Sequence, residues 1–94
     1  MNMEYLLQRK YQYERLIRNL NSCYNKLDSC YNNLVLCRKK IKNLLKIDGK
    51  YYSHEEFESI VSRVYNDRNM IRDTILPNAR YEYNKILSDI SNYG

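Results

Sequence analysis

The chain has 94 residues with 44% hydrophobic and 29% charged residues, a composition typical of one folded domain (residues 1–94) and not of a disordered chain. Two Gly and one Pro are too few for the turns of a many-stranded β fold, and no apolar run approaches the ~18–20 residues of a membrane span. With one His, no Trp, a net charge of +5 and no Gly-rich phosphate loop, we expect no enzyme activity, no cofactor and no metal site.

The positive charge is concentrated in the first half of the chain. Residues 1–50 carry eleven Lys and Arg and four Asp and Glu, whereas residues 51–94 carry five and seven. The densest basic run is Arg38, Lys39, Lys40, Lys42, Lys46 and Lys50. Such a patch is typical of a solvated helix face, and also of a surface that binds an acidic protein or nucleic-acid phosphates.

The first forty-odd residues contain no Gly or Pro and repeat every seven positions, in three sets. The leucine series is Leu6, Tyr13, Leu20, Leu27, Leu34 and Ile41; the cysteine series is Leu16, Cys23, Cys30, Cys37 and Leu44; the tyrosine series is Ile17, Tyr24, Tyr31 and Leu45. Spacings of three and four place the leucine and cysteine series at the a and d positions of a helix, and the tyrosine series widens that stripe. The pattern predicts one helix over about residues 3–46, some ~65 Å long.

A turn and a second helix are expected next. Asp48-Gly49 is a turn pair, so we place the turn at residues 47–52. Ser53 and Glu56 then match a capping box at the start of a second helix over about residues 53–92.

Pro77 interrupts the second helix and predicts a kink or a break there, since proline removes a helical hydrogen bond. Beyond Pro77 the apolar spacing resumes in a displaced register. The matched lengths of the arms favour a kink, and the expected fold is an all-α, antiparallel two-helix hairpin.

Two helices cannot cover stripes of this width, which are normally buried in bundles of three or four helices. Ile60, Tyr65 and Tyr81 should stay partly exposed in an isolated hairpin. We therefore expect a helical protein partner or a homodimer. The candidate interaction residues are Tyr13, Ile17, Leu20, Tyr24, Leu27, Tyr31, Leu34, Phe57, Val61, Val64, Ile71 and Ile75.

Cys23, Cys30 and Cys37 lie two helical turns apart, about 10 Å, which excludes an intrahelical disulfide. We expect them to fill the core of the hairpin as small apolar side chains. The alternative is a metal or disulfide site between chains. Free thiols also indicate a reducing compartment.

With two matched arms, a short Gly-containing turn and about a hundred residues, the chain resembles the Esx-like (Trp-x-Gly type) helical hairpins of type VII secretion, and more narrowly the small α-helical partner proteins of LXG toxins. The turn at residues 47–52 contains no Trp-x-Gly. The Tyr-x-x-x-Asp/Glu export motif occurs only away from the C-terminus, at Tyr24/Asp28, Tyr51/Glu55 and Tyr52/Glu56.

The resemblance implies a non-enzymatic adaptor or targeting chaperone that binds the helical N-terminal domain of a toxin, or a second small helical protein. It also implies synthesis in the cytoplasm of a Gram-positive bacterium, with export beside the partner and no cleaved signal peptide as a further option. The alternative function is a small basic nucleic-acid-binding or phage-type coiled-coil protein. Salt separates the two functions, because only phosphate binding weakens steeply with salt.

Overall fold

The computed structural model describes residues 2–48 and 54–93, with side chains described for residues 2–40 and 57–93. Its elements follow the order α1 (Met3–Asp48), α2 (His54–Met70), the π-helical η1 (Ile71–Ile75) and α3 (Leu76–Ser91). The described chain contains no strand, which confirms the all-helical expectation. We call α2, η1 and α3 together the second arm.

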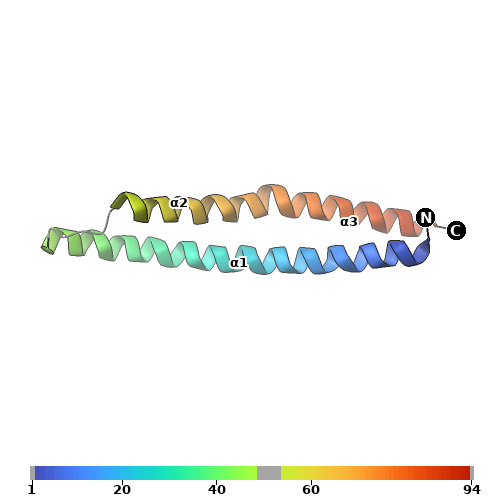
Figure 1. Ribbon diagram of the computed structural model, residues 1–94, viewed down its shortest axis with the longest axis horizontal. Coiled ribbons are helices and arrows are strands. Elements are labelled where there is room, and N and C mark those ends of the chain that lie inside the picture. Colours follow the sequence, from blue (N-terminus) through green and yellow to red (C-terminus); the bar gives the residue numbers. More distant parts are fainter. Residues whose placement is uncertain (1, 49–53, 94) are drawn as a thin grey trace.

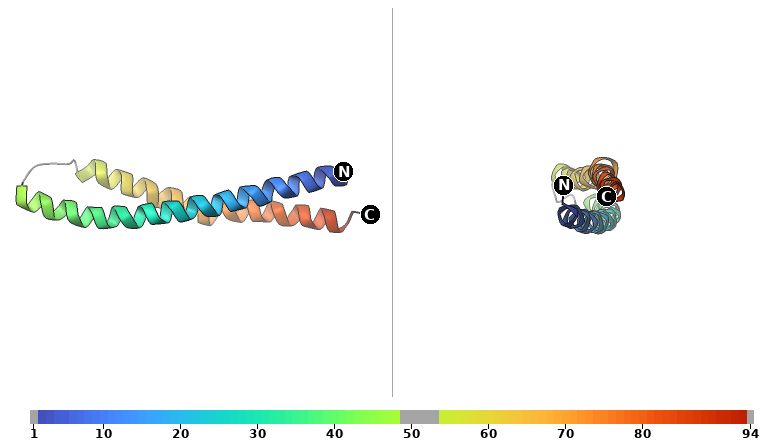
Figure 2. Two further views of the ribbon diagram at one scale, coloured as in Figure 1. Left: turned by 90° about the horizontal axis from the view of Figure 1, so that it is seen from below. Right: turned by 90° about the vertical axis from the view of Figure 1, so that its right-hand side faces the viewer.

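The arms lie side by side in a rod of 72 × 15 × 13 Å (Figure 1). Side-chain hydrogen bonds cross between the arms and join Glu14 to Tyr83, Asp28 to Arg68 and Arg38 to Glu58. Later positions in α1 thus meet earlier positions in the second arm, an order consistent with a hairpin. Figure 2 shows the arms winding past each other, with the start of α1 and the end of α3 at the same end of the rod.

The long helix α1 covers the range 3–46 that the heptad pattern predicts. Asn2 caps its start, because the Asn2 Oδ1 accepts a hydrogen bond of 2.8 Å from the Glu4 backbone N–H. The expected cap at Ser53 and Glu56 lies outside the described side chains. Of the turn expected at residues 47–52, Ile47 and Asp48 still belong to α1, and the remaining residues lie outside the described part of the chain.

The second arm stays helical through Pro77, with helical backbone angles at Ile75 and Leu76. The turn before the proline is widened instead: the Leu76 backbone N–H donates to the Ile71 carbonyl, five residues back. A π-helical turn adds one residue, so the inward positions Ile71 and Leu76 are five apart and both buried. This extra residue accounts for the register displacement that the sequence shows beyond Pro77.

The core is a narrow strip between the arms, which we call the seam. Among the described residues the buried apolar side chains are Leu6, Val61, Ile71, Leu76, Ala79 and Ile86. On α1, the described members of the leucine and tyrosine series other than Leu6 are half-buried. Ile60, Tyr65 and Tyr81 remain 50%, 43% and 65% exposed, as expected for a hairpin without neighbours.

Candidate helix-docking surface

The hairpin has two unlike long sides. In a helix each residue advances about 100°, so a position three residues after a leucine-series residue lies to one side of it and a position four residues after lies to the other. The cysteine and tyrosine series therefore flank the leucine series on opposite sides. We call the side beside the tyrosine series the polar face, and the side beside the cysteine series the thiol face.

Arg68 is the centre of the polar face. Its Nη1 bonds the Asp28 carboxylate at 2.8 Å, and its guanidinium lies 4.7 Å from the Tyr31 ring centre and 5.2 Å from the Tyr65 ring centre. The Tyr31 and Tyr65 rings are themselves 5.5 Å apart. Only 13% of the Arg68 side chain is exposed. Arg68 therefore joins α2 to the middle of α1 through an ion pair and through contacts of its guanidinium and methylene groups with the two rings.

Two further contacts join the arms toward the ends of the polar face. The Arg38 Nη1 donates to the Glu58 Oε2 at 3.1 Å, and the Tyr83 hydroxyl donates to the Glu14 Oε1 at 2.9 Å. Chiefly through this hydrogen bond, and next through partial loss of solvent, the pKa of Tyr83 is raised above its ordinary value.

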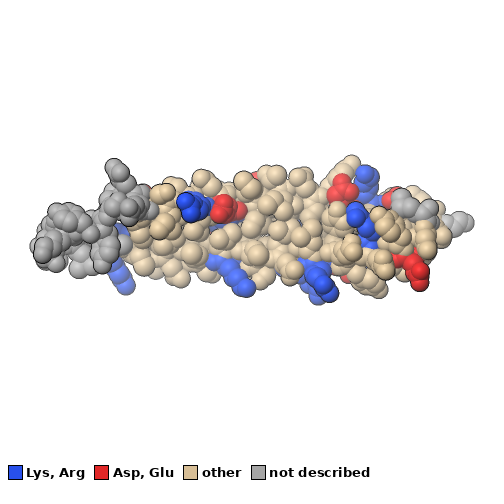
Figure 3. Space-filling view, in the orientation of Figure 1, with Lys and Arg blue, Asp and Glu red and all other residues tan. Residues whose placement is uncertain are grey.

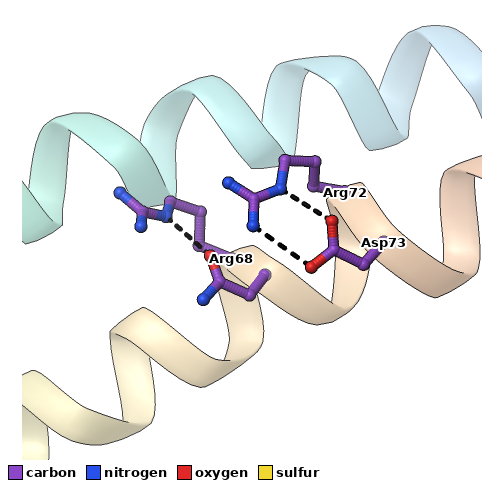
Figure 4. A network of polar contacts seen from close by, with 4 residues as sticks. Arg68, Arg72 and Asp73 are labelled. Carbon is purple, nitrogen blue, oxygen red and sulfur yellow. Dashed lines mark hydrogen bonds and ion pairs between the residues drawn. The ribbon is translucent and has the colours of Figure 1, made fainter.

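Arg72 and Asp73 form a local pair in η1, next to Arg68 (Figure 4). The guanidinium and the carboxylate share two hydrogen bonds of 2.8 and 3.1 Å. The hydrogen bond to Arg72 holds the pKa of Asp73 below its ordinary value. The polar face thus consists largely of groups that already bond one another: Glu14, Asp28, Tyr31, Arg38, Glu58, Tyr65, Arg68, Arg72, Asp73 and Tyr83.

The thiol face exposes a set of apolar side chains to solvent. Cys23, Cys30 and Cys37 are all exposed, so the expectation that they fill the core is wrong. Ile60 and Met70, on α2, are 50% and 55% exposed. The exposed apolar residues of this face are Leu16, Cys23, Cys30, Cys37, Ile60, Met70 and Ile75.

The physical reason for this error is side-chain size. The leucine series can pair with either flanking series to give a seam with spacings of three and four, but only one of the two can face the second arm. The tyrosine series offers Ile and Tyr, which bury far more apolar area than the Cys side chains on the other flank. The hairpin buries the larger set and leaves the thiols outside.

An open apolar groove runs along the thiol face between α1 and the second arm. It is lined by Cys23, Lys26, Leu27, Asp67, Met70, Ile71 and Ile75. The side of the molecule drawn in Figure 3 has this character: over its middle, uncharged side chains cover both arms and charged ones are few. Such a groove suits the apolar stripe of another helix.

The sequence-predicted interaction residues lie mainly in the seam. Val61 and Ile71 are buried and Ile75 is exposed; the half-buried members are Tyr13, Ile17, Leu20, Tyr24, Leu27, Tyr31, Leu34, Phe57 and Val64. Ile75 leaves the seam because the π-helical turn rotates it outward. Most of the predicted set therefore holds the arms together within the chain.

Only part of the basic patch can be described. Arg38 bonds Glu58, whereas Lys39 and Lys40 are exposed. The side chains of Lys42, Lys46 and Lys50 lie outside the described residues.

Sequence reasoning missed Arg68, Asp28 and Met70 as surface-defining residues. Arg68 and Asp28 sit beside apolar positions without any local motif, and only the pairing of the arms brings them together. Met70 could have been found as an apolar residue off the main stripe of α2.

Within the described residues no group of three His, Cys, Asp or Glu side chains could hold a metal ion, and no helix is long and apolar enough to cross a membrane. Comparison with known proteins finds no matching family model, no similar curated protein and no similar solved structure.

Proposed function

We propose that this protein is a non-enzymatic helical adaptor whose thiol face binds helices of a partner protein. The observation that carries the proposal is the exposure of Cys23, Ile60 and Met70 on one face, while the opposite face is closed by its own ion pairs. Covering such an apolar groove with a partner helix removes its surface from water and is favourable.

The proposal includes the architecture of the binding unit, an antiparallel hairpin whose second arm bends at η1. The cross-arm contacts at Asp28–Arg68 and Glu14–Tyr83 support the pairing. The widened turn at Ile71–Ile75 supports the bend, since π-helical turns and Pro are recognised sites of helix kinks. Met70 and Ile75 flank this turn and border the groove.

For the partner, we propose the helical N-terminal domain of an LXG toxin exported by type VII secretion, which the chain would accompany as an adaptor or targeting chaperone. Support comes from the matched arms and from the short Gly-containing turn that the sequence predicts between them. In this setting the chain is made in the cytoplasm of a Gram-positive bacterium, and a second small helical protein is the other partner that fits.

The test is co-purification with the N-terminal domain of an LXG toxin encoded beside this protein. Met70→Glu places a charge in the groove and should abolish capture. Leu36→Glu is the matched control: Leu36 is 57% exposed and lies two residues from Leu34, hence on the outer side of α1. It should bind as the parent does, and circular dichroism should show both variants helical. Equal binding by both variants would place the contact elsewhere.

The nucleic-acid alternative keeps one supporting observation, the exposure of Lys39 and Lys40. The same preparation should therefore be titrated with a labelled oligonucleotide. Binding that falls steeply with salt and is lost in a Lys39→Glu/Lys40→Glu variant would favour the alternative.

A further inference from the structure

The groove on the thiol face combines exposed apolar area with two charged residues of opposite sign on opposite arms. Lys26 on α1 and Asp67 on α2 border the same groove, with Cys23, Leu27, Met70, Ile71 and Ile75 between them. Neither Lys26 nor Asp67 forms an ion pair with another described residue of the chain. A surface that binds this groove needs apolar side chains at its centre, an anionic group opposite Lys26 and a cationic group opposite Asp67.

A second copy of the chain meets this requirement under one particular symmetry. Consider a two-fold axis that runs parallel to the long axis of the hairpin and passes over the groove. It places α1 of one copy against the second arm of the other, and each residue keeps its position along the rod. Lys26 then faces Asp67 of the second copy and Asp67 faces its Lys26, while the apolar strips meet along the axis. The product is a four-helix bundle, the assembly in which stripes of this width are normally buried.

The other two-fold arrangement, with the axis across the hairpin, stacks α1 on α1 of the second copy. It brings together two arms of the same sign, because residues 1–50 carry eleven Lys and Arg and four Asp and Glu. Lys26 would then meet the second copy's α1 instead of Asp67. Charge therefore favours the axis along the hairpin.

We propose that, in the absence of its partner, the protein is a homodimer in which the thiol faces of two copies close on each other around a two-fold axis parallel to the hairpin. The inference rests on the proposed function only in using the same face, which the partner helices take over from the second copy. One consequence is specific to this symmetry. Because each residue keeps its position along the rod, Cys23, Cys30 and Cys37 each lie opposite the same cysteine of the second copy.

Three single-cysteine variants test this consequence, each with the other two cysteines replaced by Ala. They are treated at low concentration with a short bifunctional maleimide reagent, and dimers are counted on a denaturing gel. All three should cross-link efficiently. The matched control is Leu36→Cys with all three native cysteines replaced by Ala, which carries its thiol on the outer side of α1 and should cross-link at least tenfold less.

The pattern decides between the arrangements. With the axis across the hairpin, α1 runs antiparallel to its copy, so at most one of the three variants, the one whose cysteine lies at the axis, cross-links with itself, and that result would overturn the proposal. Equal cross-linking of the Leu36→Cys control would also overturn it, as would a monomer by sedimentation equilibrium at ten micromolar.

Charge reversal gives an independent readout of the same pairing. Lys26→Glu or Asp67→Lys alone should weaken the dimer about tenfold, because each disrupts two symmetric pairs worth up to a few-fold each. The double reversal should restore the parent affinity, whereas additive weakening would contradict the Lys26–Asp67 contact. A dimer that captures no toxin domain would refute the proposed function alone, and a monomer that captures it would refute this inference alone.

Discussion

The polar face and the thiol face flank the same seam but differ in how their side chains are satisfied. On the polar face, Arg68 bonds Asp28 and stacks on Tyr31 and Tyr65, so charge and aromatic area are used within the chain. On the thiol face, Cys30 and Met70 are exposed and contact solvent. A stripe too wide for two helices is thus divided: one half holds the arms together, and the other half is exposed.

The largest effect on the two faces is expected from a charge placed in the seam between the arms. Val61 is 5% exposed, so Val61→Asp buries an unpaired carboxylate and should cost about 3 kcal/mol or more. We expect loss of the cooperative thermal transition followed by circular dichroism. Cys30→Asp is the control on the thiol face; its carboxylate stays in water in the isolated hairpin, and the variant should remain helical. A folded Val61→Asp variant would show that the seam lies elsewhere.

A smaller effect is expected on the polar face. Arg68→Ala removes the ion pair with Asp28 and the stacking on two tyrosines, and should lower the free energy of unfolding by about 1–2 kcal/mol in urea melts. Asp73→Asn is the comparison, since the Arg72–Asp73 pair joins neighbours on one turn and is exposed.

The Asp73→Asn variant should be only slightly less stable than the parent at neutral pH, because the lost pair is exposed. Because the pKa of Asp73 is lowered, the small contribution of its pair is present above the ordinary carboxyl pKa and is lost only as pH falls through the lowered value. Equal losses of unfolding free energy in Arg68→Ala and Asp73→Asn would show that the cross-arm contact of Arg68 stabilises the fold no more than the local Arg72–Asp73 pair does.

The smallest effect concerns Tyr83 and appears as a pH dependence. The hydrogen bond to Glu14 requires the protonated phenol, and the pKa of Tyr83 is raised in the folded state. Its contribution is therefore complete below the ordinary tyrosine pKa and is lost as pH rises through the raised one. Tyr83→Phe should be slightly less stable than the parent at pH 8, and the difference should vanish in strongly alkaline urea melts. A difference that is independent of pH would argue against this hydrogen bond.

Much of the fold could be predicted because it depends on local periodicity. The absence of Gly and Pro before Gly49, together with the seven-residue repeat, is enough to predict a helix that the structure extends over Met3–Asp48. The displaced apolar register around Pro77 likewise predicts an irregularity, which the structure resolves as the π-helical turn Ile71–Ile75. That the turn widens while the helix continues could not be predicted, because it depends on keeping both Ile71 and Leu76 buried against α1.

The sequence by itself determined that the chain is helical, that α1 is long and uninterrupted, and that its apolar stripe is too wide for one partner helix. Only the tertiary structure decided which flank of the leucine series faces inward. Helical geometry treats the cysteine and tyrosine series almost alike, since steps of three and four residues both return to the same side of the helix. The second arm selects the tyrosine series, because its residues Tyr65 and Arg68 contact Tyr31. Packing on this flank buries more apolar area than packing on the small cysteine side chains would.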